Sequence, residues 1–223
     1  MSNKITKNPY YGKNSKGRNL TVRIITKIVG FLAKLIFRPT YHNIHYIPLN
    51  ENYMLFSNHH SLLDPVLIHL GMPKYVYWVA KEELFNVPIL KFFLKKIEVI
   101  SLNRDEVDLT AMRQIVSCIK TGNIIGLFPQ GKRVDREKYE EVIPQAGVAS
   151  ICTRFNMTIL PCYSSGPYKA FRRNHFYFGA PFCLNPKFNN SKKSERNQDL
   201  VIEIVRRCYQ IVDLPYFREN NYS

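Results

Sequence analysis

A histidine and an aspartate five positions apart are the residues of this chain best suited to chemistry. The segment His59-His60-Ser61-Leu62-Leu63-Asp64 follows an apolar run at 53–56, which predicts a buried strand, and precedes an apolar run at 65–68, which predicts a helix. In α/β proteins such strand-to-helix turns carry catalytic groups. A histidine held by a carboxylate is a general base suited to neutral pH. We therefore predict that His59 and Asp64 form a catalytic pair.

The geometry of this pair depends on where the helix begins. On one continuous helix, residues five apart are separated by about 140° and do not meet. If the helix begins near Ser61 instead, Asp64 lies in its first turn and reaches back to His59, while Ser61 caps the helix. The carboxylate would then fix the tautomer of the imidazole and stabilise the imidazolium that forms when the ring takes a proton.

The segment alone leaves other interpretations open. The pair can be purely structural, or His59, His60 and Asp64 can bind a metal, although no further His, Asp or Glu group follows at ligand spacing. His-His-x-x-x-Asp also resembles the motif of condensation domains and chloramphenicol-type acetyltransferases, where the second histidine, here His60, would be the base. Those families have Gly after the Asp, whereas this chain has Pro65.

The bulk composition indicates anionic partners. The chain has 223 residues, enough for one domain with a sizeable core, and its 32 Lys and Arg against 17 Asp and Glu give a net charge of +15. Such an excess favours nucleic acid, a membrane surface or phosphorylated substrates. The five cysteines form no C-x-x-C pair, so we expect reduced, mostly buried thiols rather than a zinc site or a disulfide framework.

The positive charge is concentrated at the N-terminus, where no acidic residue precedes Glu51. On a helix at about 100° per residue, four basic residues of this segment lie within about 60° of one another. They are Arg23, Lys27, Lys34 and Arg38. The opposite side is apolar and consists of Ile24, Ile25, Ile28, Val29, Phe31, Leu32, Leu35 and Ile36. Such a face either packs on the domain or lies in a membrane interface with its cations on anionic headgroups; the fifty residues without an acid favour the membrane.

These features predict a peripheral protein at the cytoplasmic face of the cell membrane. No signal peptide is recognisable, and the helix over 20–37 is interrupted by Arg23, Lys27 and Lys34, so no spanning helix is predicted. A nucleic-acid partner is not predicted, because the chain has no helix-turn-helix, zinc spacing or aromatic RNA-binding strand signature.

Beyond residue 50, strand-like and helix-like segments alternate. The predicted strands cover 53–56, 75–80, 99–102, 123–128, 157–163 and 176–178. One predicted helix begins at residue 65, and the others cover 88–96, 106–120, 145–155 and 194–212. This alternation predicts an α/β fold, with a central mixed, largely parallel sheet flanked by helices. We assign residues 1–45 to the basic segment with its amphipathic membrane helix, 46–214 to the α/β domain and 215–223 to a polar tail.

Four segments in order resemble the sequence blocks of one family. Residues 58–64 resemble N-H-x-S-x-x-D, 99–104 resemble G-x-x-x-[VIL]-[DN]-R, 128–133 resemble F-P-E-G-T-R, and 159–162 resemble V-[IV]-P-V. Residues 78–84 and 178–181 look like its connecting segments. On these residues the chain, over about 20–212, is similar to the glycerolipid acyltransferase superfamily, specifically its bacterial 1-acyl-sn-glycerol-3-phosphate (lysophosphatidate) acyltransferases.

The resemblance implies a reaction of phospholipid biosynthesis. A fatty acyl group would pass from acyl-CoA or acyl-carrier protein to the free hydroxyl of lysophosphatidate, with His59 as the base and Asp64 orienting it. No metal or other cofactor is implied. The residues implied in substrate binding are Arg104, Gln130, Gly131, Lys132 and Arg133, with the two arginines on the acceptor phosphate. Those implied in support of the site are Asn58, Ser61, Pro129 and Pro161.

Three residues depart from the family pattern. Gln130 replaces Glu, Lys132 replaces Thr, and Glu98 replaces the Gly that begins the second block. Together, Gln130 and Lys132 make the pocket more positive by about two charge units. The site would then hold a phosphate more tightly, or serve another lysophospholipid, glycolipid or aminolipid acceptor. A weakly active peripheral lipid-binding protein with the same fold is the remaining alternative.

Overall fold

The central β-sheet has eight strands and is mostly parallel. The structure, a computed structural model, describes residues 20–103, 108–135, 137–184 and 193–216. The strands are β1 (Pro39–His42), β2 (Tyr53–Ser57), β3 (Val76–Lys81), β4 (Ile100–Leu102), β5 (Ile124–Leu127), β6 (Thr158–Ser164), β7 (Asn174–Phe178) and β8 (Phe182–Cys183). They are ordered β1-β7-β6-β2-β5-β3-β4, and β8 pairs with β6. Among the strands of the described residues, only the β6–β7 and β6–β8 pairs are antiparallel, and this mostly parallel sheet confirms the predicted fold class.

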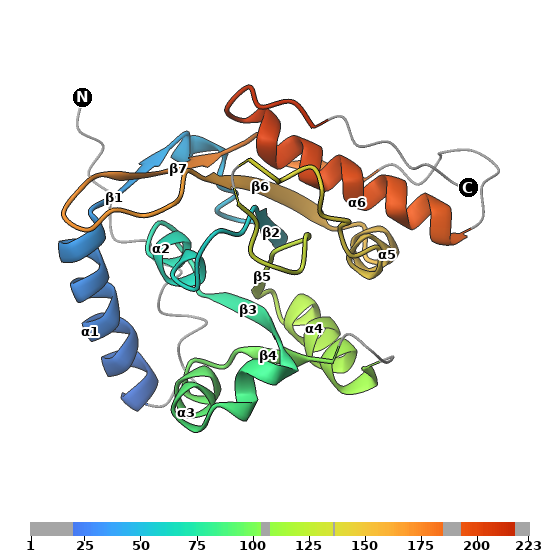
Figure 1. Cartoon of the computed structure of the whole chain (residues 1–223). Coiled ribbons are helices and arrows are strands. Elements are labelled where there is room, and N and C mark those ends of the chain that lie inside the picture. Colours follow the sequence, from blue (N-terminus) through green and yellow to red (C-terminus); the bar gives the residue numbers. More distant parts are fainter. Residues whose placement is uncertain (1–19, 104–107, 136, 185–192, 217–223) are drawn as a thin grey trace.

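Helices cover both faces of this sheet (Figure 1). They are α1 (Leu20–Phe37), α2 (Asp64–His69), α3 (Pro88–Lys96), α4 (Leu109–Lys120), α5 (Gly147–Arg154) and α6 (Lys193–Gln210), with 3₁₀ turns η2 (Ile44–Tyr46) and η3 (Glu82–Asn86). Strand β2 is buried along its whole length and shows how the two layers form. Met54 and Phe56 pack with α4, α5 and α6, whereas Tyr53 and Leu55 pack with α1 and α2, because successive side chains point to opposite faces.

The predicted elements after residue 50 are present, with ends shifted by a few residues. The helix predicted over 106–120 corresponds to α4, and residues 106 and 107 lie outside the described residues. The sequence did not indicate β1 or β8. Strand β1 is short and only half-buried, so it lacks the apolar run of a central strand, and it pairs in parallel with β7. It comes from the predicted N-terminal segment 1–45. At the other end, Tyr216 of the predicted tail is buried and stacks on Tyr209 of α6.

The start of α2 differs from the prediction. The helix begins at Asp64, not near Ser61, and Leu63 is the residue before its first turn, without a side-chain cap. The Ser61 hydroxyl instead accepts a hydrogen bond from the Leu63 N–H at 3.2 Å, within the turn that leads into the helix. Ser61 therefore shapes the turn that joins His59 to Asp64 and does not cap α2.

Glu98 departs from the family pattern at a position that favours glycine. Its φ of 56° is in the left-handed region, two residues before the start of β4. A residue with a Cβ atom is strained there, whereas glycine is not. The Gly of the family block therefore matches a backbone requirement, and the chain meets it with a more strained residue.

The five cysteines are free, and three of them are buried. Burial raises the pKa of the Cys152 and Cys208 thiols to about 12. Such thiols are protonated at neutral pH and behave as small apolar side chains.

Candidate active site

The loop between β2 and α2 brings His59 and Asp64 together. His59 Nδ1 lies 2.7 Å from Asp64 Oδ2, which also accepts hydrogen bonds from the backbone N–H groups of His60, at 2.6 Å, and Ser61, at 2.8 Å. Asp64 is fully buried at the first position of α2, so its side chain points back over the turn that precedes the helix. Because a carboxylate only accepts, His59 carries its proton on Nδ1 and has Nε2 available as a base.

The other oxygen of Asp64 is held by residues that sequence reasoning missed. The Tyr168 hydroxyl donates to Asp64 Oδ1, the Ser164 hydroxyl lies 3.4 Å from the same oxygen, and the two hydroxyls are 2.6 Å apart. Ser164 ends β6, and Tyr168 lies in the loop that leads to β7. They reach Asp64 because β6 pairs with β2 along its length, with Cys162 opposite Ser57. No signal within either segment marks this contact.

Hydrogen bonding keeps Asp64 ionised despite its burial. Burial alone would raise its pKa, but the hydrogen bonds from His59, Ser61 and Tyr168 outweigh that effect, so the pKa lies below its usual range. Burial and the neighbouring carboxylate raise the pKa of Tyr168, which therefore stays a neutral donor. The site thus combines a fixed negative charge with a histidine that accepts a proton.

His60 has its ring nitrogens engaged in the fold. Its Nδ1 lies 2.8 Å from the Val134 carbonyl oxygen, and its Nε2 lies 2.7 Å from the Asn58 side-chain nitrogen. Asn58 also bonds to the backbone N–H and carbonyl of Ser164, at 2.7 Å and 2.9 Å, so it ties the ends of β2 and β6 together. Of the two adjacent histidines, His59 is therefore the one whose geometry suits a base.

The His59 ring belongs to a stack of three aromatic groups. It lies 4.0 Å from the Phe128 ring at an angle of 16°, and Phe128 lies 5.0 Å from Trp78 at 11°. Trp78 fits over β5 because the residue beneath it is Gly126, where a Cβ atom would come within 2.6 Å of the indole. The stack fixes the plane of the imidazole and leaves its side chain 14% exposed.

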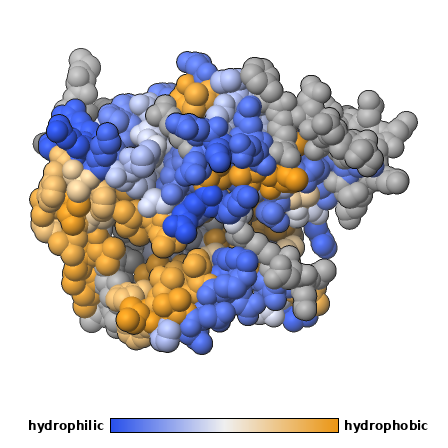
Figure 2. Space-filling view, in the orientation of Figure 1, coloured by the Kyte–Doolittle hydropathy of each residue, from blue (hydrophilic) through white to orange (hydrophobic). Residues whose placement is uncertain are grey.

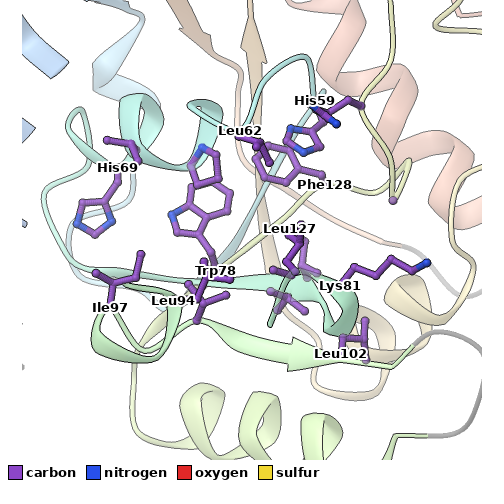
Figure 3. Close-up of a pocket in the computed structure, with 18 of the residues that line it drawn as sticks. His59, Leu62, His69, Trp78, Lys81, Leu94, Ile97, Leu102, Leu127 and Phe128 are labelled. Carbon is purple, nitrogen blue, oxygen red and sulfur yellow. The ribbon is translucent and has the colours of Figure 1, made fainter. Parts of the chain in front are cut away.

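This exposed edge faces a cavity of about 970 Å³ (Figure 3). From His59 the cavity continues past Phe128 and Trp78 to His69 and Ile97, through mostly apolar walls. The helices that line it include α1 and α3. They contribute Val29 and Gly30, and Leu90, Phe93 and Leu94, respectively. An apolar space of this size, with one base at its edge, suits a lipid chain bound beside a reacting group.

Charged groups lie at the same part of the cavity as His59. The backbone N–H of Val134 donates to the His59 carbonyl oxygen at 2.8 Å, which places the loop with Lys132 and Arg133 beside His59. Both side chains are exposed and line the cavity. Lys81 also lines it but is paired with Glu83. Lys132 and Arg133 are therefore suited to hold an anionic group next to His59.

The remaining predicted binding residues are not all in the cavity. Gly131 lines it, with a φ of 71° that favours glycine. Gln130 does not: its side chain is buried, with Nε2 2.9 Å from the Tyr139 carbonyl oxygen and Oε1 3.2 Å from the Tyr209 hydroxyl. Arg104 lies outside the described residues.

The two predicted prolines lie in the framework of the site. The Pro129 carbonyl accepts a hydrogen bond from the Gln145 N–H at 2.8 Å. Pro161 lies within β6 opposite Phe56 of β2. Within the described ranges, no cluster of three or more His, Cys, Asp or Glu side chains could hold a metal ion.

Comparison with known proteins identifies the family of the chain. The family model "Acyltransferase" matches residues 38–165. Two 1-acyl-sn-glycerol-3-phosphate acyltransferases are similar: that of Bacillus subtilis is 25% identical over 122 residues, covering 54% of this chain and 59% of the relative, and that of Streptococcus pneumoniae is 27% identical over 130 residues, covering 57% and 47%. The matches thus span about half the length of these relatives.

A solved structure is similar in fold. The crystal structure of the 1-acyl-sn-glycerophosphate (LPA) acyltransferase from Thermotoga maritima superimposes with a TM-score of 0.58 at 21% identity, over 84% of this chain and 76% of that one. The match to the family model includes His59, Asp64 and the loop with Lys132 and Arg133, and it covers more than half of the chain. The chain therefore belongs to the Acyltransferase family.

Proposed function

We propose that this protein transfers a fatty acyl group from a thioester donor, acyl-CoA or acyl-carrier protein, to the free hydroxyl of lysophosphatidate. The observation that carries the proposal is the His59–Asp64 pair, whose histidine faces a large, mostly apolar cavity beside Lys132 and Arg133. Similarity to lysophosphatidate acyltransferases supports this choice of acceptor.

The reaction needs one base and no covalent enzyme intermediate. His59 Nε2 takes the proton of the acceptor hydroxyl as its oxygen attacks the thioester carbonyl carbon, and Asp64 stabilises the imidazolium. The tetrahedral intermediate then expels the thiolate, which takes the proton back from His59. The products are a free thiol and an ester, and the histidine is again neutral.

Substrate groups are assigned by chemistry. The apolar cavity holds an acyl chain, and Lys132 and Arg133 hold the acceptor phosphate. Gln130 lies outside the cavity, so its difference from the family Glu leaves the lining charge unchanged; this supports an active enzyme over a lipid-binding protein without turnover.

The test is turnover with a matched histidine control. The purified protein is incubated with acyl-CoA or acyl-carrier protein and a panel of lysophospholipid, glycolipid and aminolipid acceptors, with products identified by mass spectrometry. We expect phosphatidate, and we expect His59→Gln to lower kcat by at least about 10²-fold because the general base is lost. The control is His45→Gln, an exposed histidine outside the cavity lining. If another acceptor is preferred, that acceptor takes the place of lysophosphatidate in the proposed reaction. Full activity of His59→Gln would refute the assignment of His59 as the general base.

We also propose that the protein binds the surface of an anionic membrane. Helices α1 and α3 contain no acidic residue, and both line the cavity. Their apolar side chains form much of one face of the molecule (Figure 2). The exposed ones are Ile24, Ile28, Val29, Phe31, Leu32 and Leu35 of α1, and Ile89, Phe92 and Phe93 of α3. Among the helices described, none is long and apolar enough to cross a bilayer. A surface of this kind, with lysines on both helices, fits the interfacial region of a membrane.

A further inference from the structure

We propose that Tyr168 is a positioning residue of this active site, which holds Asp64 so that one carboxylate oxygen is directed to His59. The inference rests on the proposed function, since it assigns Tyr168 a part in the same proton transfer. Tyr168 does not line the cavity, so it acts through Asp64 and not on the substrate.

The hydrogen bonds divide the two oxygens of Asp64. Oδ2 accepts hydrogen bonds from His59 and from two backbone N–H groups. Oδ1 accepts one from the Tyr168 hydroxyl, and the Ser164 hydroxyl lies 3.4 Å away from it. Without Tyr168, Oδ1 keeps only the long contact to Ser164. The carboxylate then becomes more basic and freer to rotate, and both changes alter its bond to His59.

The loop that carries Tyr168 is itself held in place. The Asn174 side-chain oxygen accepts a hydrogen bond from the Lys169 N–H, and its side-chain nitrogen donates to the Lys169 carbonyl, both at 3.0 Å. The same nitrogen donates to the Phe37 carbonyl at the end of α1, at 2.5 Å. The Phe171 N–H donates to the Ile36 carbonyl at 2.5 Å. The Phe37 ring meets the Tyr168 ring edge-on, with centroids 6.4 Å apart. The hydroxyl therefore reaches Asp64 from a fixed support.

A second tyrosine provides a matched control. The rings of Tyr41 and Tyr168 both pack on Phe176, each with centroids 5.6 Å apart and an interplanar angle of 35°. The Tyr41 hydroxyl donates to a neutral acceptor, the Leu67 carbonyl, at 2.6 Å. Tyr41→Phe therefore removes a comparable hydroxyl from the same apolar cluster without touching Asp64.

The experiment compares Tyr168→Phe with Tyr41→Phe in the full-length protein. We expect Tyr168→Phe to lower kcat by about tenfold with KM unchanged, and to move the acid limb of the kcat–pH profile to higher pH. The titratable groups that face Asp64 are His59, Tyr168 and, from β6, Cys162; of these, only His59 exchanges a proton with substrate. Tyr41→Phe should change stability alone. Equal kcat and equal pH profiles in the two variants would overturn the proposal.

A readout without substrate separates this proposal from the proposed function. The NMR resonance of the His59 Nδ1 proton reports the bond to Asp64. We expect it to shift in Tyr168→Phe and to stay in place in Tyr41→Phe. If the wild-type protein acylates no lysolipid but the resonance shifts, the function is wrong and the positioning role stands. An unshifted resonance in Tyr168→Phe would refute the positioning role whatever the activity.

Discussion

Gln130 joins three parts of the chain through its side-chain amide. It follows β5, its Nε2 donates to the Tyr139 carbonyl, and its Oε1 accepts from the Tyr209 hydroxyl of α6. The side chain is 2% exposed. The amide suits this position because its nitrogen donates and its oxygen accepts, and each of these two atoms has a partner.

Replacing Gln130 by the Glu of the family pattern should lower stability rather than change the acceptor. An ionised carboxylate cannot donate to the Tyr139 carbonyl, so we expect Gln130→Glu to reduce the free energy of unfolding by about 2 kcal/mol at pH 7. The loss should shrink at lower pH, because a protonated carboxyl donates again. Urea unfolding measures it, with Gln114→Glu on the exposed side of α4 as the control. A large change in acceptor preference with unchanged stability would contradict this role.

Helices α1 and α3 flank the cavity, but they are integrated into the fold to different degrees. The end of α1 accepts hydrogen bonds from Phe171, in the loop before β7, and from Asn174, the first residue of β7, and Ala33 is buried in the core. Deleting residues 1–40, the simplest test of membrane binding through α1, would therefore also damage the sheet. Helix α3 has no fully buried residue and can be changed on its exposed side alone.

The α3 face offers the clean test of membrane binding. Ile89 and Phe92 are 74% and 54% exposed, and neither lines the cavity. We expect the double change Ile89→Glu and Phe92→Glu to weaken binding to vesicles with anionic phospholipid by at least about tenfold, because apolar burial is lost and negative charge is added. Leu109→Glu, which alters a leucine that is 60% exposed at the start of α4, should bind like the wild type. Co-sedimentation measures all three, and undiminished binding of the double variant would exclude α3 from the interface.

The whole molecule carries a large positive charge, and its candidate active site holds a buried negative one. The native hydrogen bonds lower the pKa of Asp64 below its unfolded value. The stability that they contribute is therefore fully present above about pH 4, the range of an unfolded aspartate, and is lost as the pH falls through the lower, folded pKa. Protonation of other carboxyls adds repulsion to the net charge of +15 and acts in the same direction.

Asp64→Asn tests this at the scale of the whole fold. The amide has a single acceptor oxygen for the donors that surround Asp64, so we expect a loss of about 2–3 kcal/mol at pH 7. The loss should be constant down to about pH 5 and should narrow below pH 4. Urea unfolding from pH 7 to pH 3 gives both values. A difference that stays the same across this range would show that the charge of Asp64 adds no stability.

Much of the architecture was predictable from local patterns. Apolar patterns identified α1 and α3 and placed the main strands within a few residues. The spacing of apolar side chains indicates which face of an element is buried. The alternation of elements gave the α/β class. The two short strands β1 and β8 were not predicted. They have four and two residues, none of them fully buried, which is too short for such a pattern. Their place in the sheet comes from their partners, β7 and β6.

At the candidate active site, the sequence by itself determined the pairing of His59 with Asp64. The two residues are five positions apart, and a single turn between strand and helix is enough to join them. Only the tertiary structure decided what surrounds the pair: Tyr168 on the second oxygen, partners for both nitrogens of His60, and Gln130 directed away from the cavity. These contacts join residues up to 104 positions apart. Tyr168 reaches Asp64 because β6 lies beside β2, and the other contacts come from the segment after β5 and from α6. Strand order and helix placement depend on how all the elements pack together, which no local pattern records.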